Sequence, residues 1–396
     1  MNDRNIVQAF ETSEHRARLD KLRTLMSNAG MDALVVISQA NQCYLLGYEP
    51  FSGDEPQAML VTLNDDPYFI LRKMDADTAA EAGCWLPQDR VIGYAESYVG
   101  GSGEASAWEY IGQFVKDKVG ASARIGVEVS GLGVFGYHKL VGALGVQEPR
   151  DGSGLVSACR VVKSERELLY MIEAAAIADR AMLAGIDKVA VGVRHCDVGA
   201  AIMSALCAGT ETIPGGPPSP PMIRGGDRAI APHQSWSDDV FAAGQQAYIS
   251  VGACRHRYAG VVARTIHLGP LPSHRKRQHE GALAGFQAAV EVMRPGATCS
   301  DVAQAFQAAI RPYGLIKESR IGYSVGIDWV DGPSLGTNNN TEILTNMTLR
   351  LLIAFYERGE NYMLSEAVRV TKGGAELMST IPRILFERPA YNHRRK

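Results

Sequence analysis

Two apolar runs and a short turn follow a histidine in residues 231–269, APHQSWSDDVFAAGQQAYISVGACRHRYAGVVARTIHLG. The first run, YISVGA, and the second, VVARTIHLG, flank the turn. A strand, a turn and a strand in this order predict a β-hairpin. Side chains that point to one side of both strands would line a pocket, so we expect the functional site on this hairpin.

The C-terminal half of the chain places this hairpin between pairs of helices. Ser164 and Glu167 form a capping-box pair that predicts the start of a helix. We expect helices over 165–188, 197–209, 274–293 and 300–313, the last capped by Ser300 or Asp301, and further strands near the end of the chain. Two helices, a hairpin, two helices and more strands describe one pseudo-symmetric domain.

The N-terminal half alternates helical and strand patterns. We expect a helix over 13–30, strands at 33–38 and 124–129, a hairpin made of AMLVTL and PYFILR, and helices around 75–83, 105–118 and 133–144. This alternation predicts an α/β domain in which helices cover a mixed sheet. Small residues and glycines precede the capping box, so we expect a domain boundary there. It divides the chain into domains of residues 1–158 and 159–396.

A segment rich in proline and glycine, ETIPGGPPSPPMIRGGDRAIAPH, precedes the hairpin and ends at His233. Its composition predicts a loop. Unstructured loops of this length are uncommon inside compact domains and are often functional. We therefore interpret this loop as a lid or as the rim of a pocket.

The composition is that of an ordinary soluble globular protein. The 396 residues are 46% hydrophobic and 21% charged, with a formal net charge of −3, which gives no reason to expect a nucleic-acid partner. No apolar run approaches the length of a membrane span, and the N-terminus does not read as a signal peptide. Seven scattered cysteines without a CxxC pair favour reduced thiols, so we expect a cytoplasmic protein.

The order of these motifs resembles the pita-bread family of methionine aminopeptidase, aminopeptidase P and prolidase. The likeness covers nearly the whole chain: RVVKSERELLYM, the loop, His233, the hairpin, RPGATCSDV, GYSVGID and VTKGGAELM. Each motif is weak alone, but their order and distances are specific. The resemblance implies an N-terminal creatinase-like α/β domain and a C-terminal pseudo-symmetric pita-bread domain.

In that family the hairpin carries two metal-binding aspartates eleven positions apart, the second three before an Arg-Thr pair. Counting back from Arg264-Thr265 gives Val261 and Ser250. By the same alignment the ligand histidine corresponds to Tyr323, and the first glutamate to Leu352. The second glutamate corresponds to Ser365, although a one-residue bulge could direct the neighbouring Glu366 inward.

These replacements argue against a di-metal centre, which needs several anionic or imidazole ligands. The chain therefore resembles the metal-free branch of the family, which includes creatinase and ectoine hydrolase, and we expect no cofactor. Within that branch it is more similar to ectoine hydrolase, for example in APH and IPRILFE. The ectoine enzymes have a glutamate where this chain has Ser250, so the substrate or the mechanism should differ here.

We expect four catalytic residues: His233, Glu366, Ser250 and Tyr323. His233 stands seventeen positions before Ser250, as the family's histidine stands before the first aspartate, and imidazole can transfer protons near neutral pH. Glu366 would hold a cationic nitrogen of the substrate, Ser250 would donate a hydrogen bond or act as nucleophile, and Tyr323 would stabilise developing charge. The alternatives are a core histidine, a solvated strand glutamate and polar lining.

Four further residues are candidates for substrate binding: Tyr48, Phe51, Gln57 and Arg264. In creatinase-like dimers the small domain of one subunit covers the active site of the other, and the resemblance implies this role for the first three. Their alternative role is packing within their own domain. Arg264 belongs to the Arg-Thr pair and more often braces the hairpin than contacts substrate. A shared pocket predicts a homodimer.

We therefore predict a metal-independent hydrolase of a C–N bond in a small nitrogen-rich solute, with His233 as the proton shuttle. Cyclic amidines, guanidino compounds and N-acyl amino acids are candidate substrates. The alternatives are a Xaa-Pro-type metallopeptidase with altered ligands, a lyase, and a non-catalytic small-molecule-binding protein on the same fold.

Overall fold

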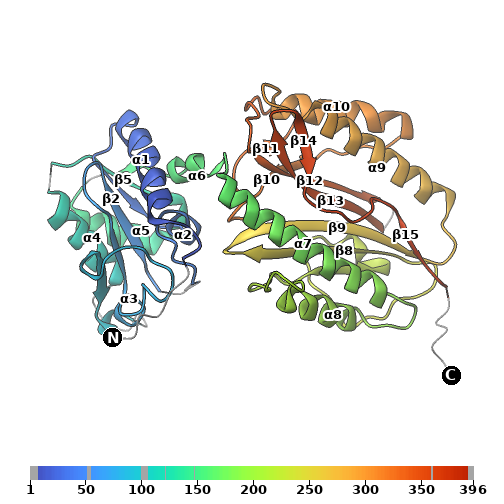
Figure 1. The fold of residues 1–396 in the computed structure, drawn as a ribbon, viewed down its shortest axis with the longest axis horizontal. Coiled ribbons are helices and arrows are strands. Elements are labelled where there is room, and N and C mark those ends of the chain that lie inside the picture. The colour runs from blue at the N-terminus through green and yellow to red at the C-terminus, as the bar shows by residue number, and fades with distance from the viewer. Residues whose placement is uncertain are drawn as a thin grey trace. The chain divides into compact units, whose positions relative to one another are not determined.

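The structure is a computed structural model that describes residues 8–50, 55–99, 106–120, 122–146, 148–357 and 360–390. The chain divides into two compact units, Met1–Arg160 and Val161–Lys396. Both units combine helices with β-sheet, which confirms the predicted mixed α/β class (Figure 1). Within the described part of the chain, no helix combines the length and the apolar character needed to cross a bilayer.

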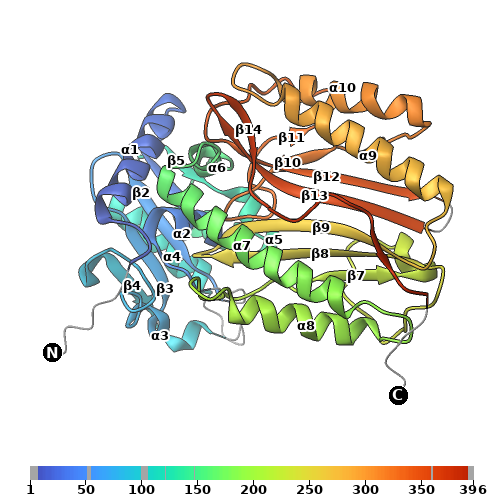
Figure 2. The ribbon, with the colours of Figure 1, turned by 45° about the vertical axis from the view of Figure 1, so that its right-hand side comes forward.

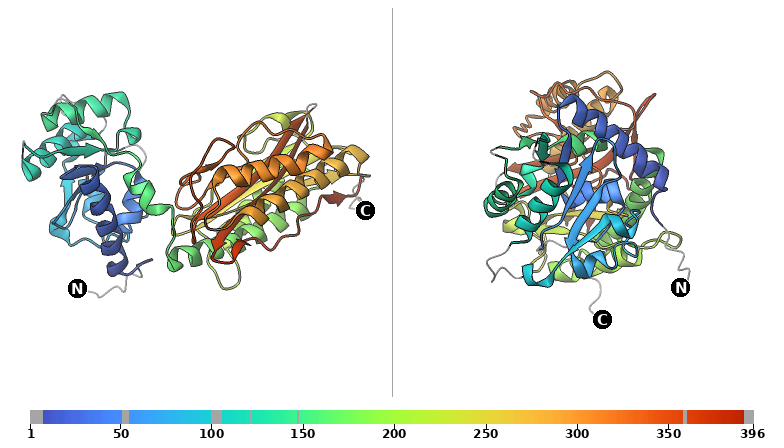
Figure 3. Two further views of the ribbon diagram at one scale, coloured as in Figure 1. Left: turned by 90° about the horizontal axis from the view of Figure 1, so that it is seen from above. Right: turned by 90° about the vertical axis from the view of Figure 1, so that its left-hand side faces the viewer.

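The N-terminal unit is built on a six-stranded mixed sheet in the order β4-β3-β2-β1-β5-β6. Its strands are β1 (Ala33–Val36), β2 (Ala58–Thr62), β3 (Tyr68–Arg72), β4 (Val91–Tyr94), β5 (Ile125–Val127) and β6 (Arg150–Asp151). Its helices are α1 (Thr12–Asn28), α2 (Gln39–Leu46), α3 (Lys73–Ala76), α4 (Ala107–Val119), α5 (Val134–Leu144) and α6 (Leu155–Arg160). Buried residues of α4 and α5 pack against β1, β2 and β5, and the right-hand view of Figure 3 shows α1 on the other side of the sheet.

The C-terminal unit is built on a nine-stranded sheet whose main path is β11-β10-β12-β13-β9-β8-β7 (Figure 2). The strands are β7 (Met222–Gly225), β8 (Gln246–Arg255), β9 (Tyr258–Leu268), β10 (Gly322–Ser324), β11 (Ser334–Leu335), β12 (Thr348–Glu357) and β13 (Glu360–Thr371). Two more strands extend it, β14 (Gly374–Leu377) beside β13 and β15 (Phe386–Arg388) beside β9.

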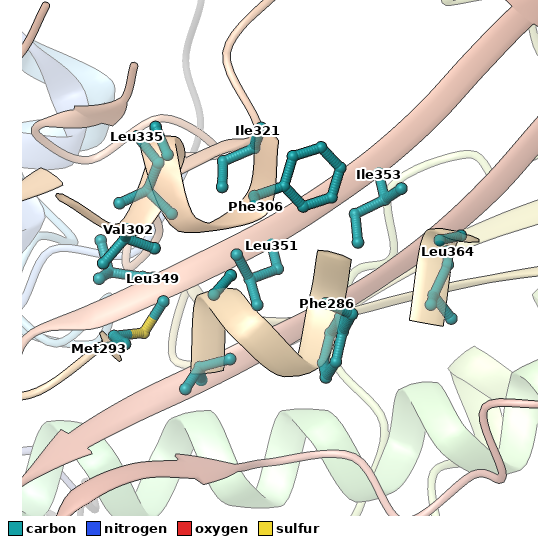
Figure 4. Packing of buried hydrophobic residues seen from close by; sticks show 14 of the residues in the cluster. Phe286, Met293, Val302, Phe306, Ile321, Leu335, Leu349, Leu351, Ile353 and Leu364 are labelled. Carbon is teal, nitrogen blue, oxygen red and sulfur yellow. The ribbon is translucent and has the colours of Figure 1, made fainter. Parts of the chain in front are cut away.

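Two helix pairs cover one face of this sheet. Helices α7 (Glu165–Lys188) and α8 (His195–Ala208) pack on the β8–β9 hairpin. Helices α9 (Ser273–Val292) and α10 (Cys299–Ile310) pack on the β12–β13 hairpin, with Phe286 and Phe306 against Leu351 and Ile353 (Figure 4). Each half therefore consists of a hairpin under two helices, which is the predicted pseudo-symmetric arrangement.

The β8–β9 hairpin forms as the sequence indicates. Its closing pair is Arg255 and Tyr258, and the two turn residues, His256 and Arg257, both have positive φ, as in a type I′ turn. The Tyr258 hydroxyl donates a 2.7 Å hydrogen bond to Glu167, whose carboxylate also accepts from the backbone N–H of Ser164 in the predicted capping box. The start of α7 is thus tied to the tip of the hairpin.

Several local predictions need correction. The segment expected to be one long loop contains β7, which pairs with β8, and a short 3-10 helix at Gly226–Ile230. The residue capping α10 is Thr298, paired with Asp301, because this pair supplies both capping-box bonds. Helix α2 lies in a segment for which no element was predicted, and α3 is only four residues long.

Candidate functional site

The two hairpins of the C-terminal sheet meet along a very short ladder. Strands β13 and β9 pair through Ser365 with Ala263 and through Glu366 with Val262. Because side chains alternate between the two faces of a strand, Ser365 and Ala263 point to one face and Glu366 and Val262 to the other. Val262 packs against the helices, so Ser365 lies on the face opposite the helices. We call that face the site face.

The strand pairing places all five positions that correspond to family metal ligands on the site face. Ser250 stands opposite Ala263, and Leu352 stands opposite Ser365. The other two positions are Val261 and Tyr323. Val261 lies two residues before Ala263 and therefore shares its face. Tyr323 pairs with Arg350, which lies two residues before Leu352 and shares its face. The sequence alignment and the register of the strands therefore agree on these positions.

A buried arginine connects three of these positions. Arg350 on β12 is 1% exposed. Its Nε donates to Ser365 Oγ at 2.7 Å, Nη1 donates to Tyr323 Oη at 3.0 Å, and Nη2 donates to Ser250 Oγ at 3.3 Å. Burial lowers the pKa of Arg350, and Tyr323 raises it in turn. The guanidinium nevertheless stays protonated at neutral pH, since arginine titrates far above it.

An aromatic side chain and small residues complete the surroundings of this guanidinium. The ring of Trp329 lies 4.8 Å from Arg350 Cζ, a distance at which a cation interacts with a ring face. Trp329 also packs on β8 at Gly252, where an added Cβ would come within 2.4 Å of the ring. Glycine at this position is therefore required for the close approach of the tryptophan.

The site face continues into an apolar cluster next to Arg350. Its buried members are Tyr248, Ala263, Ala354 and Met363, with the partly buried Met222 and Leu352 packed against them. Burial raises the pKa of Tyr248 to about 12, so its hydroxyl is neutral at physiological pH. The site face thus offers hydrogen-bond donors at one end and apolar side chains at the other.

These residues do not fit a di-metal centre. The five positions present two serines, a valine, a leucine and a tyrosine, none of which is a carboxylate or an imidazole. The Arg350 guanidinium stands among them and would repel a divalent cation. Among the residues that the structure describes, no group of three or more His, Cys, Asp or Glu side chains could hold a metal ion.

Glu366 lies on the helix-covered face, away from Ser250 and Tyr323. The ladder between β12 and β13 runs without a bulge from Thr348 and Arg369 to Glu357 and Glu360, so nothing turns Glu366 toward the site face. Its carboxylate is fully buried, forms an ion pair with Arg264, and accepts from Arg383 Nη1 at 3.0 Å. The structure thus differs from the prediction that Glu366 shapes the pocket.

Arg264 is also on the helix-covered face and is fully buried. Besides Glu366, its guanidinium binds backbone carbonyls, including those of Pro382 at 2.9 Å and Ile381 at 2.7 Å. Arg264 therefore braces the sheet against the segment after β14, and the prediction that it binds substrate is not supported by its position. The sequence had left this bracing role open.

Comparison with known proteins identifies the family. Residues 170–378 match metallopeptidase family M24, and residues 18–162 match the creatinase/prolidase N-terminal domain. The M24 match spans more than half of the chain. The chain belongs to the M24 family.

Members of the family resemble this chain along nearly its whole length. An uncharacterized hydrolase/peptidase, y4tL, from Sinorhizobium fredii is 35% identical over 382 residues, covering 96% of this chain and 97% of the relative. The ectoine hydrolase of Halomonas elongata is 28% identical over 392 residues, covering 95% and 98%. The crystal structure of dipeptidase PepE from Mycobacterium ulcerans superposes with a TM-score of 0.82 at 21% identity, covering 96% and 99%.

These comparisons confirm the predicted family and fold and support the assignment of this M24 member as a hydrolase. The family is defined by metallopeptidases, yet the residues at the expected ligand positions in this member do not suit metal ions. The relationship therefore supplies the scaffold and the reaction class, and the chemistry has to be argued from the site face.

His233 is not among the hydrogen-bond partners of Arg350 in this M24 member. It is exposed, lies three residues after the 3-10 helix at Gly226–Ile230, and has a positive φ of 61°. Its imidazole makes no hydrogen bond or ion pair with another described residue. The structure thus leaves the ring accessible to a ligand and does not place it in the core.

Two of the three N-terminal candidates are buried in their own unit. Tyr48 is 3% exposed and its ring contacts Phe69 edge to face, while the Gln57 amide donates to the side chain of Gln42. These contacts give both residues a packing role. Phe51 lies outside the described residues, and the role of all three in covering a partner's site stays a prediction.

Arg350 was missing from the sequence-based site. It stands in the apolar run MTLRLLIAFY, two positions before the Leu352 that matches a family ligand. Residues two apart in a strand share a face, and an arginine inside an otherwise apolar strand is unusual unless it is paired. These two signals together could have identified it.

Proposed function

We propose that this chain is a metal-independent hydrolase of a C–N bond in a small nitrogen-rich solute. The observation that carries the proposal is the guanidinium of Arg350, hydrogen-bonded to three of the five residues at ligand positions. The relationship to the Halomonas elongata ectoine hydrolase over nearly the full length of both chains supports this substrate class. Ser250 in place of the ectoine enzymes' glutamate favours a related solute over ectoine itself.

Water must be activated here by a proton acceptor. A guanidinium carries positive charge but does not convert bound water to hydroxide as a catalytic metal does. His233 is our candidate for this role, because its imidazole is exposed and free of partners among the described residues. The same ring would then return the proton to the leaving nitrogen. A ligand that occupies the site face would have to approach His233 for this step to occur.

Ser250 and Tyr323 are proposed to line the pocket. The described structure places no base within hydrogen-bonding distance of Ser250 Oγ, whose partner is Arg350. A serine without a base is a weak nucleophile, so we favour water as the attacking group. The hydroxyls of Ser250 and Tyr323 are held in place by Arg350 and would donate to oxygen or nitrogen atoms on which negative charge develops.

A homodimer in the cytoplasm is part of the same proposal. Creatinase-like members close their pocket with the N-terminal domain of a second subunit, and Tyr48, Phe51 and Gln57 are the residues that we propose for this contact. Light scattering of the purified protein tests the dimer directly. A monomer that retains full turnover would contradict the shared pocket.

The decisive experiment combines metal analysis with turnover. Protein purified without chelator should contain well under one equivalent of Mn, Co or Zn per chain, and chelator should not reduce its activity. The substrates to test are ectoine, hydroxyectoine, creatine and N-acyl amino acids, with Xaa-Pro dipeptides as the peptidase control. About two equivalents of metal together with dipeptide cleavage would instead establish a metallopeptidase.

Variants of His233 separate catalysis from binding. His233→Ala should abolish turnover and retain the thermal shift produced by the substrate, because a ligand stabilises the folded state whether or not it reacts. His138→Ala, at an exposed histidine in the N-terminal unit, is the matched control and should behave like wild type. Binding without any turnover in the wild type would indicate a binding protein, and products that contain no oxygen from labelled water would indicate a lyase.

A further inference from the structure

The charge of Arg350 is not balanced by an acidic side chain. Arg350 is 1% exposed, and its three hydrogen-bond partners are neutral hydroxyls. In the part of the chain that the structure describes, no carboxylate lies within ion-pair distance of its guanidinium. By contrast, the buried cations Lys163 and Arg264 each pair with a buried carboxylate, Asp331 and Glu366. Burying a charge without a counter-charge is costly, so the surroundings of Arg350 favour an anionic ligand.

The hydrogen-bonding groups around Arg350 also lack an acceptor. A guanidinium has five N–H groups, and three of those on Arg350 are used, which leaves two. Ser250, Tyr323 and Ser365 each accept from Arg350 through oxygen and retain their own O–H. No described residue accepts from these three hydroxyls. The guanidinium and the three hydroxyls therefore retain N–H and O–H groups that have no acceptor among the described residues.

The neighbouring apolar cluster restricts the kind of anion. An arginine fork matches both carboxylate and phosphate oxygens. Met222 and Leu352, the partly buried members of the cluster, lie on the site face next to Ser250 and Ser365 respectively. Such a surface would contact an apolar group attached to the anion, which an inorganic anion does not have. A guanidinium beside apolar side chains therefore favours a small organic acid as the ligand.

We propose that Arg350 binds the carboxylate of the substrate, with the hydroxyls of Ser250, Tyr323 and Ser365 as additional donors. This inference rests on the proposed function and makes it more specific: the solute that is hydrolysed carries a carboxylate, and the apolar cluster of Met222 and Leu352 contacts its carbon skeleton. The Trp329 ring, 4.8 Å from Arg350 Cζ, packs beside the guanidinium and helps to hold it in place.

Binding measurements test this assignment without requiring turnover. The probes are matched pairs that differ only in the carboxylate: N-acetylglycine, N-acetylalanine and N-acetylleucine, each against its amide. By calorimetry the wild type should bind at least one acid more tightly than its amide, by about 10- to 100-fold for a charge-assisted pair of hydrogen bonds. Arg350→Gln should remove this preference. Arg311→Gln, at an exposed arginine without a side-chain partner among the described residues, should keep it.

Several outcomes would overturn the assignment. Equal affinity for acid and amide in every pair would exclude carboxylate recognition, and so would a preference that survives Arg350→Gln. Inorganic phosphate that binds more tightly than all of the acids would identify an inorganic anion site instead. If Arg350→Gln does not fold, Arg350→Lys replaces it as the test. Lysine keeps the positive charge but lacks the planar fork of the guanidinium, so the preference for acid over amide should fall. An unchanged preference in Arg350→Lys would contradict the proposal.

These results are independent of the test of the proposed function. Metal content and chelator-resistant turnover can fail while the protein still prefers acids to amides, and the preference can be absent from an enzyme that turns over without metal. The two proposals can therefore be rejected separately.

Discussion

Replacing Glu366 should weaken the fold and leave the chemistry intact. Glu366 is fully buried on the helix-covered face between Arg264 and Arg383. Burial raises the pKa of Glu366, and the two guanidinium groups lower it in turn. Glu366→Gln preserves the shape of the side chain and removes its charge, so the buried Arg264 loses its counter-ion. Removing one partner of a buried ion pair costs about 3–5 kcal/mol in the free energy of unfolding.

The backbone contacts of Arg264 set where in this range the loss should fall. Carbonyls of Pro382 and Ile381 and the remaining amide oxygen at position 366 still accept from the guanidinium, which favours the lower end, about 3 kcal/mol. Arg264→Met alone should also destabilise the protein. The double variant should lose clearly less than the sum of the single changes, because both halves of one interaction are then absent.

Urea unfolding, followed by circular dichroism and tryptophan fluorescence, measures these differences. Glu376→Gln is the matched control, because Glu376 is exposed and should change the free energy of unfolding by no more than about 0.5 kcal/mol. Turnover per folded molecule should stay close to wild type in Glu366→Gln. Unchanged stability together with a large fall in kcat would refute the bracing role and return Glu366 to the active site.

Three further changes can be predicted from the structure. Burial lowers the pKa of Lys317 to about 8 from 10.5, so between these pH values the unfolded lysine keeps its proton while the folded one has lost it. The free energy of unfolding should therefore rise by roughly 3 kcal/mol as pH increases from 8 to about 10.5. Lys317→Met should abolish this rise in urea unfolding, and a rise that persists in the variant would disprove the assignment to Lys317. Burial and Arg18 lower the pKa of His15 to about 4 from 6.5, so between these pH values only the unfolded state binds a proton at this residue. The free energy of unfolding should therefore fall by roughly 3 kcal/mol as pH drops from 6.5 to 4. A His15 imidazole that titrates by NMR near 6.5 would contradict this prediction. Gly252→Ala should displace Trp329, shift its fluorescence to longer wavelength and cost about 1–3 kcal/mol; an unchanged spectrum would count against the packing described.

Local signals predicted much of the fold. The capping box at Ser164 and Glu167 sets the start of α7, and the apolar runs around the Arg255–Tyr258 turn form the β8–β9 hairpin, because each signal acts over a few residues. Strand β7 was missed because its four residues lie among prolines and glycines, and pairing with β8 supplies its stability. That contribution comes from a neighbouring strand and is not visible in the local sequence.

For the candidate site, too, the sequence was informative about local spacing but not about contacts between strands that are distant in sequence. Counting from the Arg-Thr pair gives Ser250, which the strand register places opposite Ala263 on the site face. Glu366 was misplaced because a shift of one residue moves a side chain to the opposite face, and only the observed ladder excludes a bulge. Arg350 was overlooked because its partners come from β8, β10 and β13, which meet only when the two hairpins are assembled.

The guanidinium of Arg350 is a permanent part of the polypeptide. A bound ion has to be captured from the surroundings and can be lost to a competing chelator or replaced by another element. A positive charge that is encoded as a side chain is present in every copy from the moment of folding, whatever the supply of trace elements. The same permanence fixes its strength, so the charge at this position can change only through mutation and never by exchanging one ion for another.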